Sequence, residues 1–275
     1  MKVALMFFLV VLLSACALAG GWPQQAGTLG FSPSVSFYSA QRQYSPTGGM
    51  THIYYDGTFN MTVLTLYGEW GATEDLTIIG DIPVFHAAFE ARDSTHTYTR
   101  TLTAPSYVGA GVRYAVYRTA GKVVSLAAAL HVPPGFHRGL FDDPSHGFLS
   151  DGYFEAVAGI ECGATTRWGW VEAATLFHAR DEEAENELEM RGVVGFSSQK
   201  LVKVKISVIA MKALAPLPDL PLNVEETTTA EDYMWIDGQM LFTVAPNVTL
   251  AASLGVRVLG AHTLALSGGG ISVLF

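Results

Sequence analysis

The sequence predicts an all-β protein, a closed antiparallel up-and-down transmembrane β-barrel of about twelve strands. Three observations lead to this prediction. Hydrophobic residues make up 49% of the chain, yet beyond residue 20 no apolar stretch approaches the ~20 residues of a membrane-spanning helix. Segments of period-two alternation follow one another, and the connections between them differ systematically in length. Charged residues are only 15% of the chain, which is low for a soluble domain and ordinary for a wall facing lipid.

The alternation identifies each strand and its two faces. In the segment 122–132, Val124, Leu126 and Leu130 share one face, whereas Ser125 and His131 share the other. A soluble β-sandwich alternates in the same way, so the assignment to a membrane also depends on the connections and the charges. The predicted strands span residues 28–42, 57–71, 76–89, 104–117, 122–132, 151–164, 168–180, 187–197, 201–212, 231–244, 248–260 and 263–275.

The connections between these strands alternate between short and long. Short links follow the even-numbered strands, at 72–75, 118–121, 165–167, 197–200 and 245–247. Longer links follow most odd-numbered strands, at 43–56, 90–103, 133–150 and 213–230. Two links depart from this rule, because 181–186 is only moderate and the last one, near His262, is tight. Short turns on one side and long loops on the other are typical of outer-membrane barrels, whose short turns lie in the periplasm.

Charged residues inside the predicted strands share the less apolar face. A Lys or Arg that faces lipid near the bilayer centre costs about 2–4 kcal/mol, so this face is expected to be the inner one. Arg113 is the nearest expected counter-ion of Glu69 and Asp81. The candidates for lining the lumen are Glu69, Asp81, Arg113, Glu155, Glu161, Glu172, Glu189, Arg191, Lys203, Lys205, Asp237 and Arg257.

Two interpretations of these inward charges remain open. They could line a conduction path, in which clusters of opposite sign orient a solute in transit. They could instead form a salt-bridged plug that fills the interior. A barrel of about twelve strands lies between the filled barrels of about eight strands and the open porins of about sixteen, which favours the pore.

The first nineteen residues have the layout of a secretory signal peptide. Lys2 is followed by an apolar run from Val3 to Leu13 and by small residues ending at Ala19, so we expect cleavage after Ala19 and a barrel over 20–275. A lipobox with lipidation at Cys16 is the alternative. Cleavage after Ala19 leaves Cys162 as the single cysteine and excludes an intrachain disulfide. It also makes the net charge −10, from −9 for the full chain, which argues against nucleic acid as a partner.

The chain ends in a strand-like segment whose last residue is aromatic. Ile271, Val273 and Phe275 share one face of this segment. Such an ending resembles the insertion signal of Gram-negative outer-membrane barrels, which predicts recognition of Phe275 by the barrel-assembly machinery. The expected location is therefore the cell outer membrane, with the lipid bilayer and lipopolysaccharide as partners. A sheet in lipid cannot leave an open edge, so the last strand is expected to pair with the first.

No motif for catalysis, metal or cofactor binding emerges from the sequence. The segment 142–151 holds Ser145 and His146, but neighbours in a loop give no reason for their side chains to meet. The acidic segments 181–189 and 225–232 lack the ordered spacing of a calcium loop, and the eight His are scattered without metal-ligand spacing. We therefore expect no catalytic residues, no metal and no cofactor. A lipid-modifying barrel enzyme is the least favoured functional class.

Four stretches together resemble a known family. They are "GGWPQQAGTLGF" at the expected mature start, "LYGEWGATEDLTIIGDIPVF", "YRTAGKVVSLAAALHVPPG" and "APNVTLAASLGVRVLGAHTLALSGGGISVLF" at the end. The family is that of transporter-like bacterial outer-membrane barrels named after the meta-pathway of phenol degradation. The resemblance implies uptake of aromatic or other apolar compounds and brings no catalytic residues. The sequence thus predicts a passive channel for small molecules, and a closed structural or adhesive barrel is the alternative.

Overall fold

The computed structural model describes residues 21–44, 50–52, 57–92, 97–133, 154–180, 186–197, 202–214, 232–245, 248–261 and 266–274. These residues form strands joined by turns, and no helix of the described chain is long and apolar enough to cross a membrane. The strands are β1 (Leu29–Ala40), β2 (Arg42–Tyr44), β3 (Met50–His52), β4 (Thr58–Gly71), β5 (Leu76–Arg92), β6 (Thr97–Pro105), β7 (Val108–Thr119), β8 (Lys122–Val132), β9 (Glu155–Thr166), β10 (Gly169–Arg180), β11 (Glu187–Ser197), β12 (Val202–Ala213), β13 (Asp232–Ala245), β14 (Val248–Ala261) and β15 (Ser267–Leu274).

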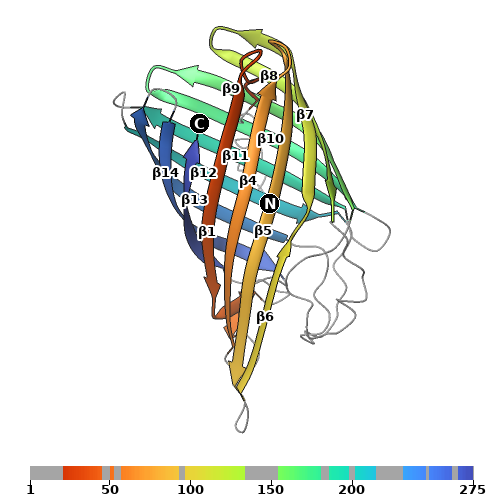
Figure 1. Ribbon diagram of the computed structural model, residues 1–275, viewed down its shortest axis with the longest axis vertical. Helices are drawn as coiled ribbons and strands as arrows, with labels where there is room; N and C mark the ends of the chain where they lie inside the picture. Colours follow the sequence, from red (N-terminus) through yellow and green to blue (C-terminus); the bar gives the residue numbers. More distant parts are fainter. Residues whose placement is uncertain are drawn as a thin grey trace, which may run out of the picture.

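The large sheet closes on itself (Figure 1). Each strand pairs antiparallel with its neighbours, β15 pairs with β1, and β4 pairs with both β1 and β5. β6 and β7 pair with the two ends of β5 and together occupy one position in the wall. The barrel therefore has twelve strand positions, which confirms the predicted fold class.

Most strand boundaries agree closely with the sequence prediction, but the fourth predicted strand does not, the sixth begins only at Glu155, and the predicted loop 43–56 contains part of the short hairpin β2–β3. β8 and β11 coincide with the predicted segments 122–132 and 187–197. The predicted strand 104–117 and the predicted loop 90–103 are wrong in part, because β5 continues to Arg92 and β6 pairs with it along 97–105. The alternating threonines of β6 favour an extended backbone. The resulting β5–β6 hairpin projects beyond the barrel, at the bottom of Figure 1.

The outer face of the wall carries the apolar residues that the alternation predicts. Leu64, Leu66, Ile78 and Ile82 are all exposed, with between 37% and 42% of their surface accessible. Near the short turns the exposed Trp168 stacks on a second aromatic ring, Phe196, with centroids 5.2 Å apart. Aromatic residues at this level are typical of the girdle at a membrane interface.

Some sequence predictions fall outside the described residues. These are the signal peptide at residues 1–19, the alternative lipidation at Cys16, and the role of Phe275 in recognition by the assembly machinery. Of the predicted terminal face, Ile271 and Val273 are described on the outside of β15, where Ile271 is exposed and Val273 is half-buried.

The closure between β1 and β15 can be tested by cross-linking. Ser34 and Ser272 are direct partners, so their Cα atoms are about 4.5–5.5 Å apart, within the range that a disulfide spans. We expect the double variant Ser34→Cys/Ser272→Cys, in a Cys162→Ser background, to form that disulfide on oxidation. Gel mobility of the unfolded chain would report the circularised product. Thr65→Cys/Ser272→Cys, two strands and about 10 Å apart, is the control, and efficient cross-linking there would contradict the register.

Candidate functional site

Buried charges gather on the inner face of the barrel wall. This face is identified by side chains that meet although their strands are not neighbours, which is possible only across a concave surface. Arg113 of β7 provides the clearest case, because it contacts both β4 and β9, with β5 and β8 lying between.

Arg113 is held between two carboxylates. Its Nε lies 2.5 Å from Oε2 of Glu161, and its Nη1 lies 3.0 Å from Oε1 of Glu69. The Tyr67 hydroxyl donates a further hydrogen bond to Glu69. The residue opposite Arg113 on β8 is Ala127, whose small side chain leaves room for the guanidinium. This triad of Arg113, Glu69 and Glu161 joins five positions of the wall.

Burial makes these contacts essential for the stability of the triad. Arg113 is 7% exposed and Glu161 is 6% exposed. A charge buried at this level costs several kcal/mol unless it is paired and hydrogen-bonded. One guanidinium serves two carboxylates here, so removal of the cation would leave both acids without compensation.

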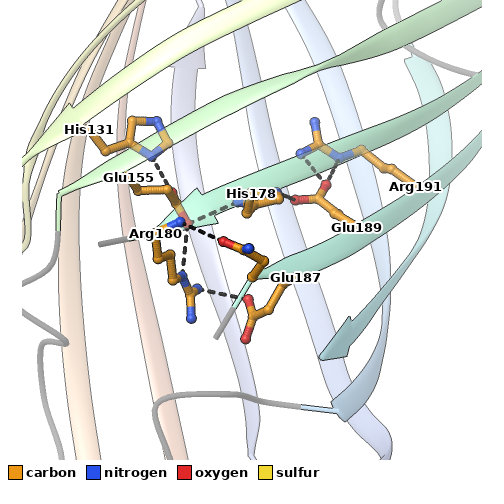
Figure 2. Close-up of polar contacts among 8 residues, drawn as sticks. His131, Glu155, His178, Arg180, Glu187, Glu189 and Arg191 are labelled. Carbon is orange, nitrogen blue, oxygen red and sulfur yellow. Dashed lines mark hydrogen bonds and ion pairs between the residues drawn. The ribbon is translucent and has the colours of Figure 1, made fainter. Parts of the chain in front are cut away.

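A second network lies toward the loop end, on β8–β11 (Figure 2). Glu155 of β9 is its centre and accepts three contacts. Its carboxylate lies 2.6 Å from Nδ1 of His131, 3.0 Å from Nδ1 of His178 and 3.1 Å from Nε of Arg180. Each of these donors comes from a strand adjacent to β9.

The network continues onto β11. Arg180 Nη2 lies 2.8 Å from Oε2 of Glu187, and His178 Nε2 lies 3.3 Å from Oε2 of Glu189. Arg191 closes the series with Nη2 2.6 Å from Glu189 Oε1. In the described part of the chain, no three His, Cys, Asp or Glu side chains are grouped to hold a metal ion. Alternation of acids with arginines and histidines makes this a network of ion pairs.

The N-terminal segment, residues 21–28, contacts the inner wall near the short turns. Ser125 Oγ donates a hydrogen bond to the Gly21 carbonyl. The Trp22 ring lies where a Cβ on Gly163 would stand, and the Trp22 carbonyl lies 3.5 Å from Arg113 Nη1. The start of the described chain is therefore attached to β8, β9 and the Arg113 triad.

The rest of this segment follows β5 and β4 out of the barrel. The backbone N–H of Gln24 donates a hydrogen bond to Thr77 Oγ1 at 2.7 Å, and Ala26 forms a parallel β-bridge with Gly71. A Cβ on Gly71 would collide with the backbone of Gln25. The close approach of two backbones requires glycine at this position, because no other residue leaves the space.

Two aromatic rings lie flat on the inner wall of β13–β15 and β1. Trp235 covers Gly255, where a Cβ would collide with its ring, and Tyr38 covers Gly268 in the same way. The two rings meet edge to face, with centroids 5.8 Å apart and planes inclined by 62°. Glycine thus lets a large side chain lie along the wall instead of projecting into the interior.

The other predicted lining residues lie on the same inner face without joining the two networks. Asp81 lies over Gly109, where a Cβ would collide with its carboxylate, Asp237 accepts a hydrogen bond from Ser207, and Arg257 stacks over Tyr233 with its Cζ 4.3 Å from the ring centroid.

Five of the predicted charges form no ion pair within the described residues, namely Asp81, Glu172, Lys203, Lys205 and Asp237. Lys205 lies beside Gln239 in the register, Lys203 lies beside Leu241, and Glu172 lies between Gly163 and Val193.

An apolar sector faces the second network across the barrel at the loop end. Phe59 and Phe85 are each 3% exposed and pack with Ala40, Ala87 and Ala104. Their strands, β4 and β5, stand opposite β11 and β12 in the closed order, so the sector faces the β11 end of the network. The loop-end interior is therefore apolar on one side and ionic on the other.

Sequence reasoning missed several of the residues in these contacts. Arg180 and Glu187 flank the acidic segment 181–186, whose composition is typical of a solvated loop, and their pairing depends on the β10–β11 register. Trp22 had a sequence signal, since a tryptophan among small and polar residues before the first strand is unusual. Periodicity alone does not place it inside the barrel.

The arrangement of strands is similar to that of known outer-membrane barrels. The COG4313 outer membrane channel from Pseudomonas putida F1 aligns over 93% of this chain and 97% of its own, with a TM-score of 0.64 and 8% identity. The transport unit of the autotransporter AIDA-I from Escherichia coli aligns over 97% and 96%, with a TM-score of 0.51 and 11% identity. No family model and no curated protein matches the sequence. The likeness establishes the fold, a closed antiparallel β-barrel like those of these outer-membrane proteins.

The Arg113 triad predicts an asymmetric response to mutation. Arg113→Met leaves the buried Glu161 and the partly buried Glu69 without their cation and is expected to lower the free energy of unfolding by about 3–5 kcal/mol, measured by urea unfolding in detergent. The triple variant Glu69→Gln/Arg113→Met/Glu161→Gln should recover most of this loss.

The matched control is Arg118→Met on the same strand. Arg118 is 38% exposed and pairs with Glu74, so its loss should change the free energy of unfolding by less than about 1 kcal/mol. Equal destabilisation by the single and triple variants would show that Arg113 acts through packing and not through charge.

Proposed function

We propose that the protein is a passive outer-membrane channel for small molecules, and that its path runs between the N-terminal segment and the wall of β12–β15 and β1. The observation that carries this proposal is the unequal filling of the barrel near the short turns. The segment and the Arg113 triad occupy the side of β4–β9. The opposite inner face holds small residues such as Ser253, Gly270 and Ser36. Small side chains leave a path where bulky ones would close it.

The twelve predicted lining residues divide into two roles in this proposal. Those in the two networks hold the wall and the segment in place. Of the remaining charges, Lys203 and Lys205 face the path, because they lie on β12, half way around the barrel from β5. Fixed charges at a narrow passage select ions by sign.

The loop-end interior, which is apolar on one part of the wall and ionic on another, indicates which class of solute could enter. Phe59 and Phe85 offer apolar contact, and the network around Glu155 offers hydrogen-bonding groups on another part of the same wall, from β8 to β11. Such an entrance suits small molecules that have an apolar or aromatic body and a polar substituent. The family resemblance noted from the sequence implies the same kind of compound.

Export and assembly belong to the same proposal. We propose that residues 1–19 are a signal peptide removed after Ala19, that the C-terminal strand engages the barrel-assembly machinery, and that the mature chain lies in the outer membrane of a Gram-negative bacterium, against lipopolysaccharide. The mass of the purified mature protein tests the cleavage, since a lipid-modified Cys16 would give a different value.

Conductance in planar bilayers tests the path. The refolded mature chain should conduct, and a chain beginning at Gly27 should conduct severalfold more, because the deletion removes Trp22 and the contacts with Ser125 and Thr77. Heat-modifiable migration on a gel confirms that each chain has folded. Absence of conductance from both chains would overturn the channel and favour a closed structural or adhesive barrel.

The two lysines are expected to set ion selectivity. Lys203→Ala/Lys205→Ala should shift the reversal potential under a salt gradient toward cation selectivity, because it removes positive charge from the path. Lys122→Ala is the matched control, since Lys122 is exposed at the short-turn end and shares the outer face of β8 with Leu126. An unchanged reversal potential in the double variant would show that the path avoids these lysines.

A further inference from the structure

A groove crosses the outer face of the wall near the loop end. It runs over β5, β4, β1, β15 and β14 and has a volume of about 550 Å³. Its lining includes the aromatic Phe37, the aliphatic Leu254 and the polar residues Asn60, Thr62 and His86. The groove is therefore amphipathic, and it lies on the opposite face of the wall from the proposed path.

The strand register places the groove at a boundary. In the outward row nearer the short turns, Ile271, Val35, Leu64 and Val84 stand side by side, and all are apolar. The next row changes character, since Leu254, Gly269 and Phe37 are followed by Thr62, His86 and Thr103. The following row holds Ser267, Ser39 and Asn60. The groove lies where the lipid-facing band gives way to hydroxyl and amide groups.

The polar surface continues from the groove onto the β5–β6 hairpin, which projects beyond the barrel at the bottom of Figure 1. The outward residues of β6 are Thr97, Thr99, Thr101 and Thr103, and all four are exposed. His86 Nδ1 lies 2.6 Å from Thr103 Oγ1, which links the groove to this row of hydroxyls. The long connections lie at this end, so the surface faces the outer leaflet and the space above it.

We propose that this groove binds a glycolipid. An acyl chain lies against Phe37 and Leu254, whose side chains are 56% and 77% exposed, and the sugar headgroup contacts Asn60, Thr62 and His86. The lining that the structure describes contains no Lys or Arg, the residues that recognise phosphate. Neutral hydroxyl and amide groups suit sugar hydroxyls, and continuity with the apolar band suits a ligand anchored in the same leaflet.

The test compares two lipids that differ only in headgroup. Full-length mature protein in mixed micelles receives equal amounts of digalactosyl diacylglycerol and phosphatidylglycerol with the same acyl chains, and native mass spectrometry counts the lipids retained. The wild type should retain the galactolipid in preference. Asn60→Leu/Thr62→Val/His86→Leu should retain roughly tenfold less of it, as expected from the loss of two or three hydrogen bonds. Thr175→Val, an exposed threonine on the outer face of β10, should behave as the wild type.

Each result decides the proposal. Preference for phosphatidylglycerol, equal retention of the two lipids, or unchanged retention by the triple variant would overturn it. If the triple variant does not show heat-modifiable migration, the single variant His86→Leu takes its place, and unchanged galactolipid retention by that folded variant also overturns the proposal. Conductance is measured separately, so the result is independent of the channel function.

Discussion

The hydrogen bonds between β1 and β15 are the constraint on which the rest of the structure depends. A backbone group left unpaired in hydrocarbon costs several kcal/mol, so a membrane sheet must close. Six residue pairs join the two strands. Closure gives every strand an inner and an outer face and brings distant strands face to face. Without it, Arg113 could not reach carboxylates on β4 and β9.

The closed wall creates an electrostatic problem and also supplies its solution. Acids placed inward avoid lipid but lose bulk water, so they need partners of their own. The triad of Arg113 and the network around Glu155 supply those partners along β4–β11. The N-terminal segment binds to the same region through the Trp22 carbonyl and Ser125. Groups that stabilise the wall therefore also position the segment that narrows the barrel.

Sequence periodicity was sufficient to predict the barrel architecture, because one face of each barrel strand faces the interior and the other faces lipid. Both ends of β8 and of β11 could be read from alternation alone. The extent of β6 could not be predicted in this way, because exposed threonines also occur in loops. The pairing of Arg113 with Glu69 could be predicted because their strands are close in the sequence. The pairing of Arg180 with Glu187 depends on the register of β10 and β11, and the position of Trp22 depends on how closely the N-terminal segment approaches Gly163. Strand register and the approach of two backbones are properties of the folded chain, and neither produces a periodic pattern in the sequence.

The glycines of the last strand have a consequence for the mechanical strength of the wall. A Cβ on Gly268 or Gly270 would collide with the backbone of β1, so the two strands approach with no side chain interposed. The two glycines contribute no side chain to this joint, so cohesion there comes from the backbone hydrogen bonds and from Tyr38, which lies over Gly268 and meets Trp235. The two strands can pair at these glycines without any side chain there having to adopt a particular rotamer. We therefore expect this joint to resist load through its backbone hydrogen bonds and through the contact that Tyr38 and Trp235 make across Gly268.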